Sequence, residues 1–337
     1  MFVFPPICRP SLLVPLFLLS GCIGMRTPLD DGAIRDSAVA CGKTITIDTT
    51  PVQPDILILL DRSASMTWSL TADSNCAAGV TTCSSRSAAV VSAVGAIVTD
   101  NPKINWGLAL FPTSDAATCS ISSTPQVAIS ASSASAIKSQ LAAFTTSLST
   151  PTASIINVAT AYLKKVNDGR NKAILLATDG LPNCGSGQDW ASNDMTGATD
   201  AATAAKKAGF PVYVIGIGPS VSNLNSLAQA GGTGSYYPAT STTALSAALQ
   251  SIATAASLTC TFKANTVPPD KDLALVYVDS NLVAKDDSNG WMFDPSDATN
   301  ATIVLTGSTC ENMLAGATSQ VQIVFGCPEA SSPDLMP

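Results

Sequence analysis

An aspartate and two serines at alternate positions form the first group in this sequence that could bind a ligand. Asp61, Ser63 and Ser65 directly follow the aliphatic run Ile56–Leu60. Such a run is typical of a strand buried on both faces in a parallel sheet. Oxygen donors spaced in this way can converge on one point, and hard oxygen ligands suit a hard cation such as Mg²⁺. The same residues would also serve as an ordinary strand-to-helix loop with a capping Asp or Ser.

Two further polar residues occur at similar places later in the chain. Thr150 precedes a helical pattern, and Asp179 follows the aliphatic strand pattern Ala173–Ala177. Each has an ordinary explanation when it is read alone. Thr150 could cap the helix, with Pro151 near the first turn, and Asp179 followed by glycine is a common turn signal.

The elements that would position these residues alternate between strands and helices. The expected strands are Asp55–Leu60, Ile104–Phe111, Ala173–Ala177, Val212–Ile217 and Tyr236–Tyr237. The expected helices are Ser87–Val98, Ser135–Leu148, Ser154–Val166, Ala198–Ala208, Ser222–Ala230 and Thr242–Ser257. This alternation predicts an α/β fold with a doubly wound, mostly parallel sheet. Such sheets bind ligands beyond the carboxyl ends of their strands, where Asp61 and Asp179 lie.

Taken in this order, these residues resemble the metal-ion-dependent adhesion site of von Willebrand factor A-like (vWA) domains. The family pattern is D-x-S-x-S after the first strand, a Thr before a middle helix and an Asp at the end of the fourth strand. The resemblance covers about residues 45–258 and implies a Rossmann-like vWA domain. It assigns the metal ligands to Asp61, Ser63, Ser65, Thr150 and Asp179.

The resemblance also implies how the site would work. The hydroxyls bind the cation directly, the carboxylates bind it directly or through water, and an acidic side chain of a partner protein fills the remaining position. The cation is expected to be Mg²⁺, with Mn²⁺ or Ca²⁺ as alternatives. Ser149 stands where the family usually has Gly, so Thr152 remains an alternative to Thr150. The stretch Thr178–Cys184 resembles a bacterial secreted subgroup.

Composition excludes several classes of function. The chain has 337 residues, a net charge of −7 and no His. The acidic balance provides no basic stripe for nucleic acid. The absence of His removes the commonest general base and the Ser-His-Asp and Cys-His arrangements. Most hydrolase functions are therefore excluded.

The N-terminus carries the features of an export signal. Ser11–Ser20 is a short apolar segment, too short to span a membrane as a helix. It leads into Leu19–Cys22, which resembles the bacterial lipobox, although an ordinary signal peptide is the alternative. We expect a lipoprotein signal peptide at residues 1–21, a lipid (palmitate-bearing) anchor on Cys22 and a tether at 22–40. Ile23 after the cysteine favours, by resemblance, the outer membrane.

Eight of the ten cysteines remain after Cys8 and Cys22 are set aside. An even number in an exported protein predicts disulfides. We expect Cys76–Cys83 within one loop, Cys119–Cys184 beside Asp179, and Cys310–Cys327 around the last strand. The resemblance to A domains, whose two ends lie together, implies the fourth bond, Cys41–Cys260.

The last part of the chain has a different pattern. Short β-type runs separated by Pro, Asp, Asn and Gly predict a small antiparallel β module at 261–328, after a vWA domain at 41–260. A disordered tail is expected at 329–337.

These features favour a non-enzymatic, metal-dependent protein-binding or adhesion lipoprotein of the bacterial cell envelope. Its partner would present an exposed Asp or Glu. One alternative is a structural envelope module whose metal only stabilises loops. Another is an accessory subunit of a larger complex, of the kind some A domains form with ATPases. The export signal and the even cysteine count argue against a cytoplasmic machine of that kind.

Overall fold

The computed structural model describes residues 45–77, 79–113, 119–185, 193–221, 223–267, 271–315 and 320–325. The chain divides into two units, residues 1–43 and 44–337, and the described residues all belong to the second. The expected signal peptide, tether, C-terminal tail, Cys22, Cys41 and Cys327 lie outside them. No helix in the described part is long and apolar enough to cross a membrane.

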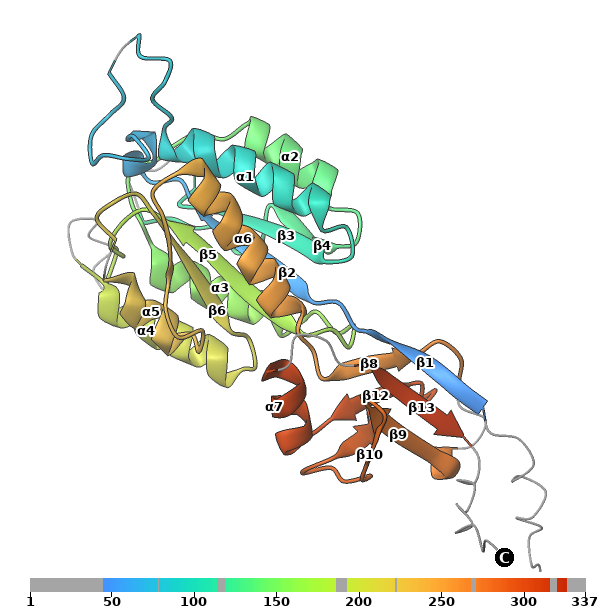
Figure 1. The fold of residues 1–337 in the computed structure, drawn as a ribbon. Helices are drawn as coiled ribbons and strands as arrows, with labels where there is room; N and C mark the ends of the chain where they lie inside the picture. The colour runs from blue at the N-terminus through green and yellow to red at the C-terminus, as the bar shows by residue number, and fades with distance from the viewer. Residues whose placement is uncertain are drawn as a thin grey trace, which may run out of the picture. The chain divides into compact units, whose positions relative to one another are not determined.

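The second unit contains a six-stranded sheet with the order β4-β3-β2-β5-β6-β7 (Figure 1). All neighbouring pairs are parallel except β3 with β4. The strands are β2 (Asp55–Asp61), β3 (Asn105–Phe111), β4 (Val127–Ser130), β5 (Lys172–Thr178), β6 (Val212–Ile217) and β7 (Tyr237–Ala239). The predicted α/β fold with a mostly parallel sheet is therefore confirmed.

Helices cover both faces of this sheet. On one face pack α1 (Arg86–Asp100), α2 (Ala134–Ala142) and α6 (Thr242–Ser257). On the other pack α3 (Thr152–Leu163), α4 (Met195–Lys207) and α5 (Leu224–Ala230). Alternate residues of β2 supply the two cores: Ile56, Ile58 and Leu60 the first, Leu57 and Leu59 the second. A strand buried on both faces needs an unbroken aliphatic sequence.

The order of the strands determines where a ligand can bind. From β2 the chain builds outwards to β3 and β4, and then returns to the other side of β2 with β5. The carboxyl ends of β2 and β5 therefore lie side by side at the point where strand order reverses. These are the strands that end at Asp61 and Thr178.

A second, antiparallel sheet has the order β10-β9-β13-β1-β8-β12-β11. It comprises β1 (Ile45–Pro51), β8 (Thr261–Ala264), β9 (Ala274–Val278), β10 (Asn281–Val283), β11 (Trp291–Phe293), β12 (Thr302–Leu305) and β13 (Val321–Phe325), with helix α7 (Gly307–Ala315) in the same region. The C-terminal antiparallel module is thus confirmed.

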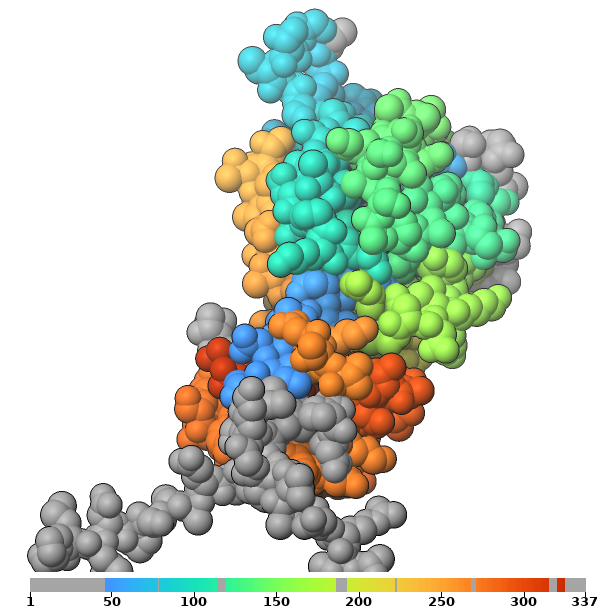
Figure 2. All heavy atoms as spheres, turned by 90° about the vertical axis from the view of Figure 1, so that its right-hand side faces the viewer, coloured from blue at the N-terminus to red at the C-terminus, as the bar shows by residue number. Residues whose placement is uncertain are grey.

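One strand of this module comes from the other end of the chain. β1 precedes the parallel sheet in sequence but pairs with β13 and β8. Figure 2 shows its blue atoms among the orange and red atoms of the C-terminal strands. The sequence analysis, which assigned residues 261–328 to the module, did not include β1. In the chain, the α/β domain is therefore inserted between two strands of the module, β1 and β8.

The disulfides agree with two of the expected pairs and contradict the other two. Cys76 is bonded to Cys83 and Cys119 to Cys184, as expected. Cys260 is bonded to Cys310, so the predictions of Cys41–Cys260 and Cys310–Cys327 are both wrong. The reason is that Cys260 directly precedes β8 and Cys310 lies on α7, and both pack against the core of the antiparallel module.

We expect Cys41 to be linked to Cys327. They are the two cysteines left once the three described bonds are assigned and Cys8 and Cys22 of the expected signal and anchor are set aside. The strands nearest to them in sequence, β1 and β13, are antiparallel, with Ile45 opposite Phe325. Peptide mapping without reduction would identify the linked pair, and free thiols at both positions would contradict this expectation.

A buried polar pair lies at the start of β2 and β3. Asn105 Nδ2 donates to Asp55 Oδ1 at 3.0 Å. Asp55 Oδ2 and Asn105 Oδ1 are buried and have no hydrogen-bond partner in the described structure, although Lys172 Nζ is 3.9 Å from Asp55 Oδ2. Burial, and then the charge of Asp168, raise the pKa of Asp55 to about 6. A proton on Oδ2 could satisfy both unpaired oxygens.

Asp55→Asn is therefore expected to stabilise the protein at neutral pH by about 1–3 kcal/mol, because an amide can supply the missing donor. The folded pKa of Asp55 lies above its ordinary value, so wild-type stability falls as pH rises from about 4 to about 6. The variant should lose the part of this dependence that Asp55 contributes, while Asp61, whose pKa is also raised, retains its own contribution. Urea unfolding at about pH 4.5 and about pH 7.5 measures the effect, with Asp200→Asn, on the exposed surface of α4, as the control. An unchanged pH dependence would contradict the assignment.

Candidate metal centre

Asp61 is the last residue of β2, and both of its carboxylate oxygens are held by hydrogen bonds. Asp61 is fully buried. Its Oδ1 accepts a hydrogen bond from the backbone N–H of Ser63 at 2.7 Å. Its Oδ2 accepts one from Thr178 Oγ1 at 2.6 Å. The carboxylate therefore joins the ends of the two central strands.

Asp179 brings the two serines to the same point. Its Oδ1 accepts from Ser65 Oγ at 2.8 Å and from Ser63 Oγ at 3.4 Å. The two serine hydroxyls are 3.2 Å apart. Four of the five residues predicted as metal ligands thus gather at the carboxyl ends of β2 and β5, as the strand order requires.

Thr150, the fifth predicted ligand, lies on the loop before α3 and is buried. Its backbone N–H donates to Asn183 Oδ1 at 2.6 Å, and its carbonyl accepts from the N–H of Asn183 at 3.0 Å. None of the described hydrogen bonds joins its hydroxyl to the other four residues. Asn183, which sequence reasoning did not single out, ties the Thr150 loop to the segment that follows Asp179.

The sequence analysis also missed Arg86, the first residue of α1. Its side chain is 2% exposed, and Nη1 donates to Asp179 Oδ2 at 2.9 Å. The spacing of residues in the sequence could have indicated this role. Arg86, Val90 and Val94 lie four residues apart, which places them on one face of a helix, and all three are buried. A basic residue on the buried side of an amphipathic helix needs a buried partner.

Both carboxyl groups of the site resist ionisation. Burial, and then the charge of Asp179, raise the pKa of Asp61 to about 7. Burial also raises the pKa of Asp179, against the opposing effect of its hydrogen bonds from Arg86 and Ser65. A divalent cation between the two carboxylates would remove their repulsion and favour both charged forms.

The donor set fits a hard cation. Two carboxylates and two hydroxyls supply oxygen ligands only, which is the preference of Mg²⁺ and Ca²⁺. The described residues include no group of three or more His, Cys, Asp or Glu placed to bind a metal. A cation here would therefore depend on the serine hydroxyls as well as on the carboxylates.

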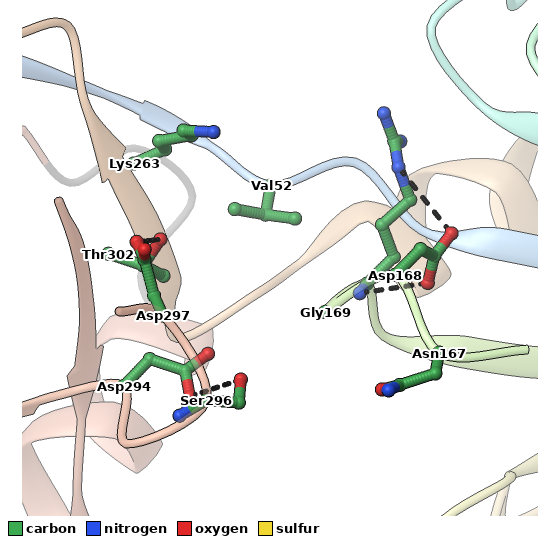
Figure 3. A pocket seen from close by; sticks show the side chains of 10 residues that line it. Val52, Asn167, Asp168, Gly169, Lys263, Asp294, Ser296, Asp297 and Thr302 are labelled. Atoms are coloured by element: carbon green, nitrogen blue, oxygen red, sulfur yellow. Dashed lines mark hydrogen bonds and ion pairs between the residues drawn. The ribbon is translucent and has the colours of Figure 1, made fainter. Parts of the chain in front are cut away.

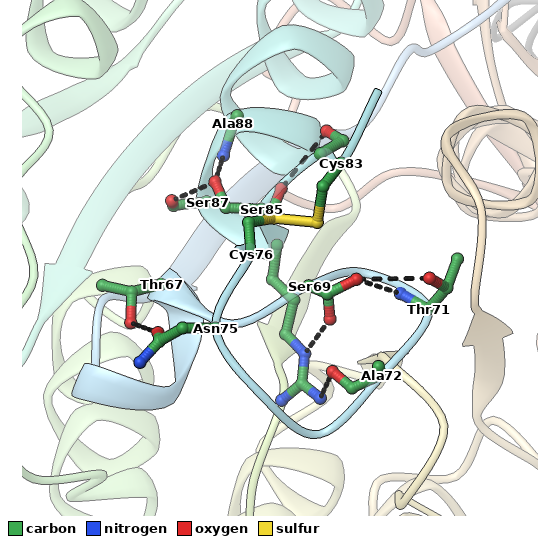
Figure 4. The surroundings of a disulfide bond; sticks show 12 residues. Thr67, Ser69, Thr71, Ala72, Asn75, Cys76, Cys83, Ser85, Ser87 and Ala88 are labelled. Carbon is green, nitrogen blue, oxygen red and sulfur yellow. Dashed lines mark hydrogen bonds between the residues drawn. A yellow bond between two sulfur atoms is a disulfide. The ribbon is translucent and has the colours of Figure 1, made fainter. Parts of the chain in front are cut away.

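Two disulfides hold the loops around the site. Cys76–Cys83 closes the loop between the serines and α1, and Ser85 Oγ beyond it caps α1 by accepting from the N–H of Ala88 at 3.1 Å (Figure 4). Cys119–Cys184 ties the loop after β3 to the segment after Asp179. These bonds restrict the loops in the unfolded chain as well as in the folded one.

A cavity of about 360 Å³ elsewhere includes none of the predicted ligands (Figure 3). Its lining residues are Val52, Asn167, Asp168, Gly169, Arg170, Lys263, Asp294, Ser296, Asp297 and Thr302. Its carboxylates are already engaged. Asp294 Oδ1 accepts from Ser296, Asp297 Oδ2 from Thr302 and Asp168 Oδ1 from Lys172. These contacts stabilise local turns, so we place the candidate site at Asp61 and Asp179.

Comparison with known proteins identifies the fold. The family model of the von Willebrand factor type A domain matches residues 55–254. No curated protein sequence matches the chain.

Similar solved structures include the PilB minor pilin from Streptococcus sanguinis, with 17% identity and a TM-score of 0.46 over 60% of this chain and 61% of the pilin. The conserved hypothetical protein BatB from Bacteroides thetaiotaomicron has 22% identity and a TM-score of 0.42 over 59% of this chain and 97% of its own. The pilus adhesin SpaC from Lactobacillus rhamnosus GG has 18% identity and a TM-score of 0.47 over 84% of this chain and 40% of its own.

Proposed function

The chain belongs to the von Willebrand factor type A domain family, and from that premise we propose that it is a non-enzymatic protein that binds a partner through a divalent cation. The cation, Mg²⁺ in preference to Mn²⁺ or Ca²⁺, is held by Asp61, Ser63, Ser65, Thr150 and Asp179. The observation that carries this proposal is the meeting of Ser63 and Ser65 with Asp179 Oδ1 at the junction of β2 and β5.

The residues of the site have different roles in binding the cation. Asp61 and Asp179 supply the negative charge, and Ser63 and Ser65 supply neutral oxygens that complete the donor set. When bound, the cation supplies a positive charge that attracts an Asp or Glu side chain of the partner. Because two carboxylates and a few hydroxyls do not saturate six-coordinate Mg²⁺, a position remains for that exchangeable ligand.

The alternative of a purely structural metal has less support. The loops of the site are already joined by the hydrogen bonds from Thr178 to Asp61 and from Ser65 to Asp179. The paired bonds of Thr150 with Asn183 and the bond Cys119–Cys184 hold the remaining loop. A metal is therefore not needed to bring these loops together.

We also propose a location outside the cytoplasm. Three disulfides among the described residues are expected only in an oxidising compartment. The lipobox-like sequence ending at Cys22 would anchor the mature protein by a lipid in the bacterial cell envelope, at the outer membrane.

The experiment that tests the function has two arms. Calorimetric titration with MgCl₂ and MnCl₂ measures cation binding directly. Immobilised protein is then exposed to a cell-envelope extract with Mg²⁺ and eluted with chelator, with an Asp179→Asn column as the matched control. Proteins that elute from the wild-type column alone support the proposal. Cation binding without any such protein would favour the structural alternative, and no cation binding would overturn both.

A further inference from the structure

Arg86 occupies a closely fitted slot between the candidate cation site and the loop Trp68–Ser85. On the inner side, Nη1 donates to Asp179 Oδ2 at 2.9 Å. A Cβ added at Gly218, whose φ is +99°, would lie 2.7 Å from Arg86 Cζ. Glycine is therefore required where the backbone after β6 passes the guanidinium, and Arg86 has little freedom to move elsewhere.

On its outer side the same guanidinium holds the loop. Nε donates to the carbonyl of Ser69 at 3.2 Å, and Nη2 donates to the carbonyl of Ala72 at 3.3 Å and to Asp73 Oδ1. Cζ lies 5.4 Å from the centre of the Trp68 ring. Asp73 Oδ2 in turn accepts from Ser220 Oγ. The buried guanidinium of Arg86 thus links the loop to Asp179.

The guanidinium of Arg86 and a bound metal cation would both interact with the carboxylate of Asp179. Its Oδ2 faces Arg86, whereas its Oδ1 faces the serine hydroxyls where a cation would bind. Asp179 and Arg86 are both almost fully buried, so their charges are weakly screened, while Asp73 is 37% exposed. The more completely Arg86 neutralises Asp179, the less negative charge remains for a cation.

We propose that Arg86 is a positioning residue through which the loop Trp68–Ser85 tunes the cation affinity of the site. This inference rests on the cation binding proposed above. The negative charge of Asp73 offsets part of the positive charge that Arg86 presents to the site and so strengthens cation binding. A partner that moves the loop moves Asp73 with it, and so weakens cation binding. By linkage, the bound cation weakens the affinity of that partner for the displaced loop by the same factor.

The test compares Mn²⁺ affinities by calorimetry. Arg86→Gln should bind Mn²⁺ more tightly, by about tenfold, because it removes the competing charge. Arg86→Lys keeps the charge and should stay close to wild type. Asp73→Asn should bind severalfold more weakly, and this effect should become smaller when it is combined with Arg86→Gln. Arg170→Gln, on an arginine that bonds to the carbonyl of Gln53, is the matched control and should change nothing.

The direction in which Mn²⁺ affinity changes in these variants distinguishes the proposed role of Arg86 from a purely structural one. If Arg86 only filled space, Arg86→Gln would lower the melting temperature and leave Mn²⁺ affinity equal or weaker, which would overturn the inference. An effect of Asp73→Asn that is equally large with and without Arg86 would also overturn it. If Arg86→Gln does not fold, unchanged affinity in Asp73→Asn decides against the inference. A wild-type protein that binds no Mn²⁺ would overturn the proposed function itself.

Discussion

Asp179→Asn is expected to abolish binding of Mg²⁺ and Mn²⁺, with a loss of affinity greater than about 100-fold. Asp179 is the one residue on which Ser63, Ser65 and Arg86 all converge. The asparagine oxygen can still accept a hydrogen bond, but the charge that attracts the cation is gone. Asp61→Asn removes the other carboxylate and should have the same effect.

Asparagine is chosen so that a loss of cation binding can be distinguished from a loss of the fold. Asp179→Ala would leave the buried guanidinium of Arg86 without its inner partner, which is costly in a protein interior. Asparagine retains an acceptor for that group. Circular dichroism and melting temperature should show an intact fold, and Asp200→Asn on exposed α4 is the control for loss of one acidic charge. Undiminished Mn²⁺ affinity in Asp179→Asn would refute the site.

Cys22→Ser is expected to release the protein from membranes almost completely. A lipid chain contributes about 0.8 kcal/mol for each buried CH₂ group, and serine offers no thiol to carry that chain. Fractionation followed by a salt wash measures the effect, with Cys8→Ser as the matched control. Cys22→Ser protein that stays in the washed membrane pellet would contradict a lipid anchor at this position.

Local patterns were sufficient to predict the elements that carry the candidate site. The aliphatic runs of β2 and β5 require burial on both faces, so they indicated central strands, and the polar residues that follow them had to lie at one edge. β6 and α6 begin and end where the sequence predicted. The shorter β4, whose side chains are partly exposed, has no such pattern and was missed.

The features that sequence reasoning missed depend on contacts between distant residues. β1 pairs with β13, which lies at the far end of the chain, and no local periodicity indicates a partner at that separation. The Cys260–Cys310 bond follows from α7 lying against the antiparallel module. Arg86 was visible as a charge on the inner face of α1, but its partners are Asp179, just after β5, and the loop at Ser69.

The route of the chain through β1 has a mechanical consequence for the partner binding proposed at Asp61. Tension between Asp61 and the residues before Ile45 runs along β2 and β1, joined only by Val52–Pro54. The strands from β8 onwards lie beside this load path and are attached to it by hydrogen bonds. Because extended strands already span about 3.3 Å per residue, the module could open and refold under load without lengthening the chain between Ile45 and Asp61.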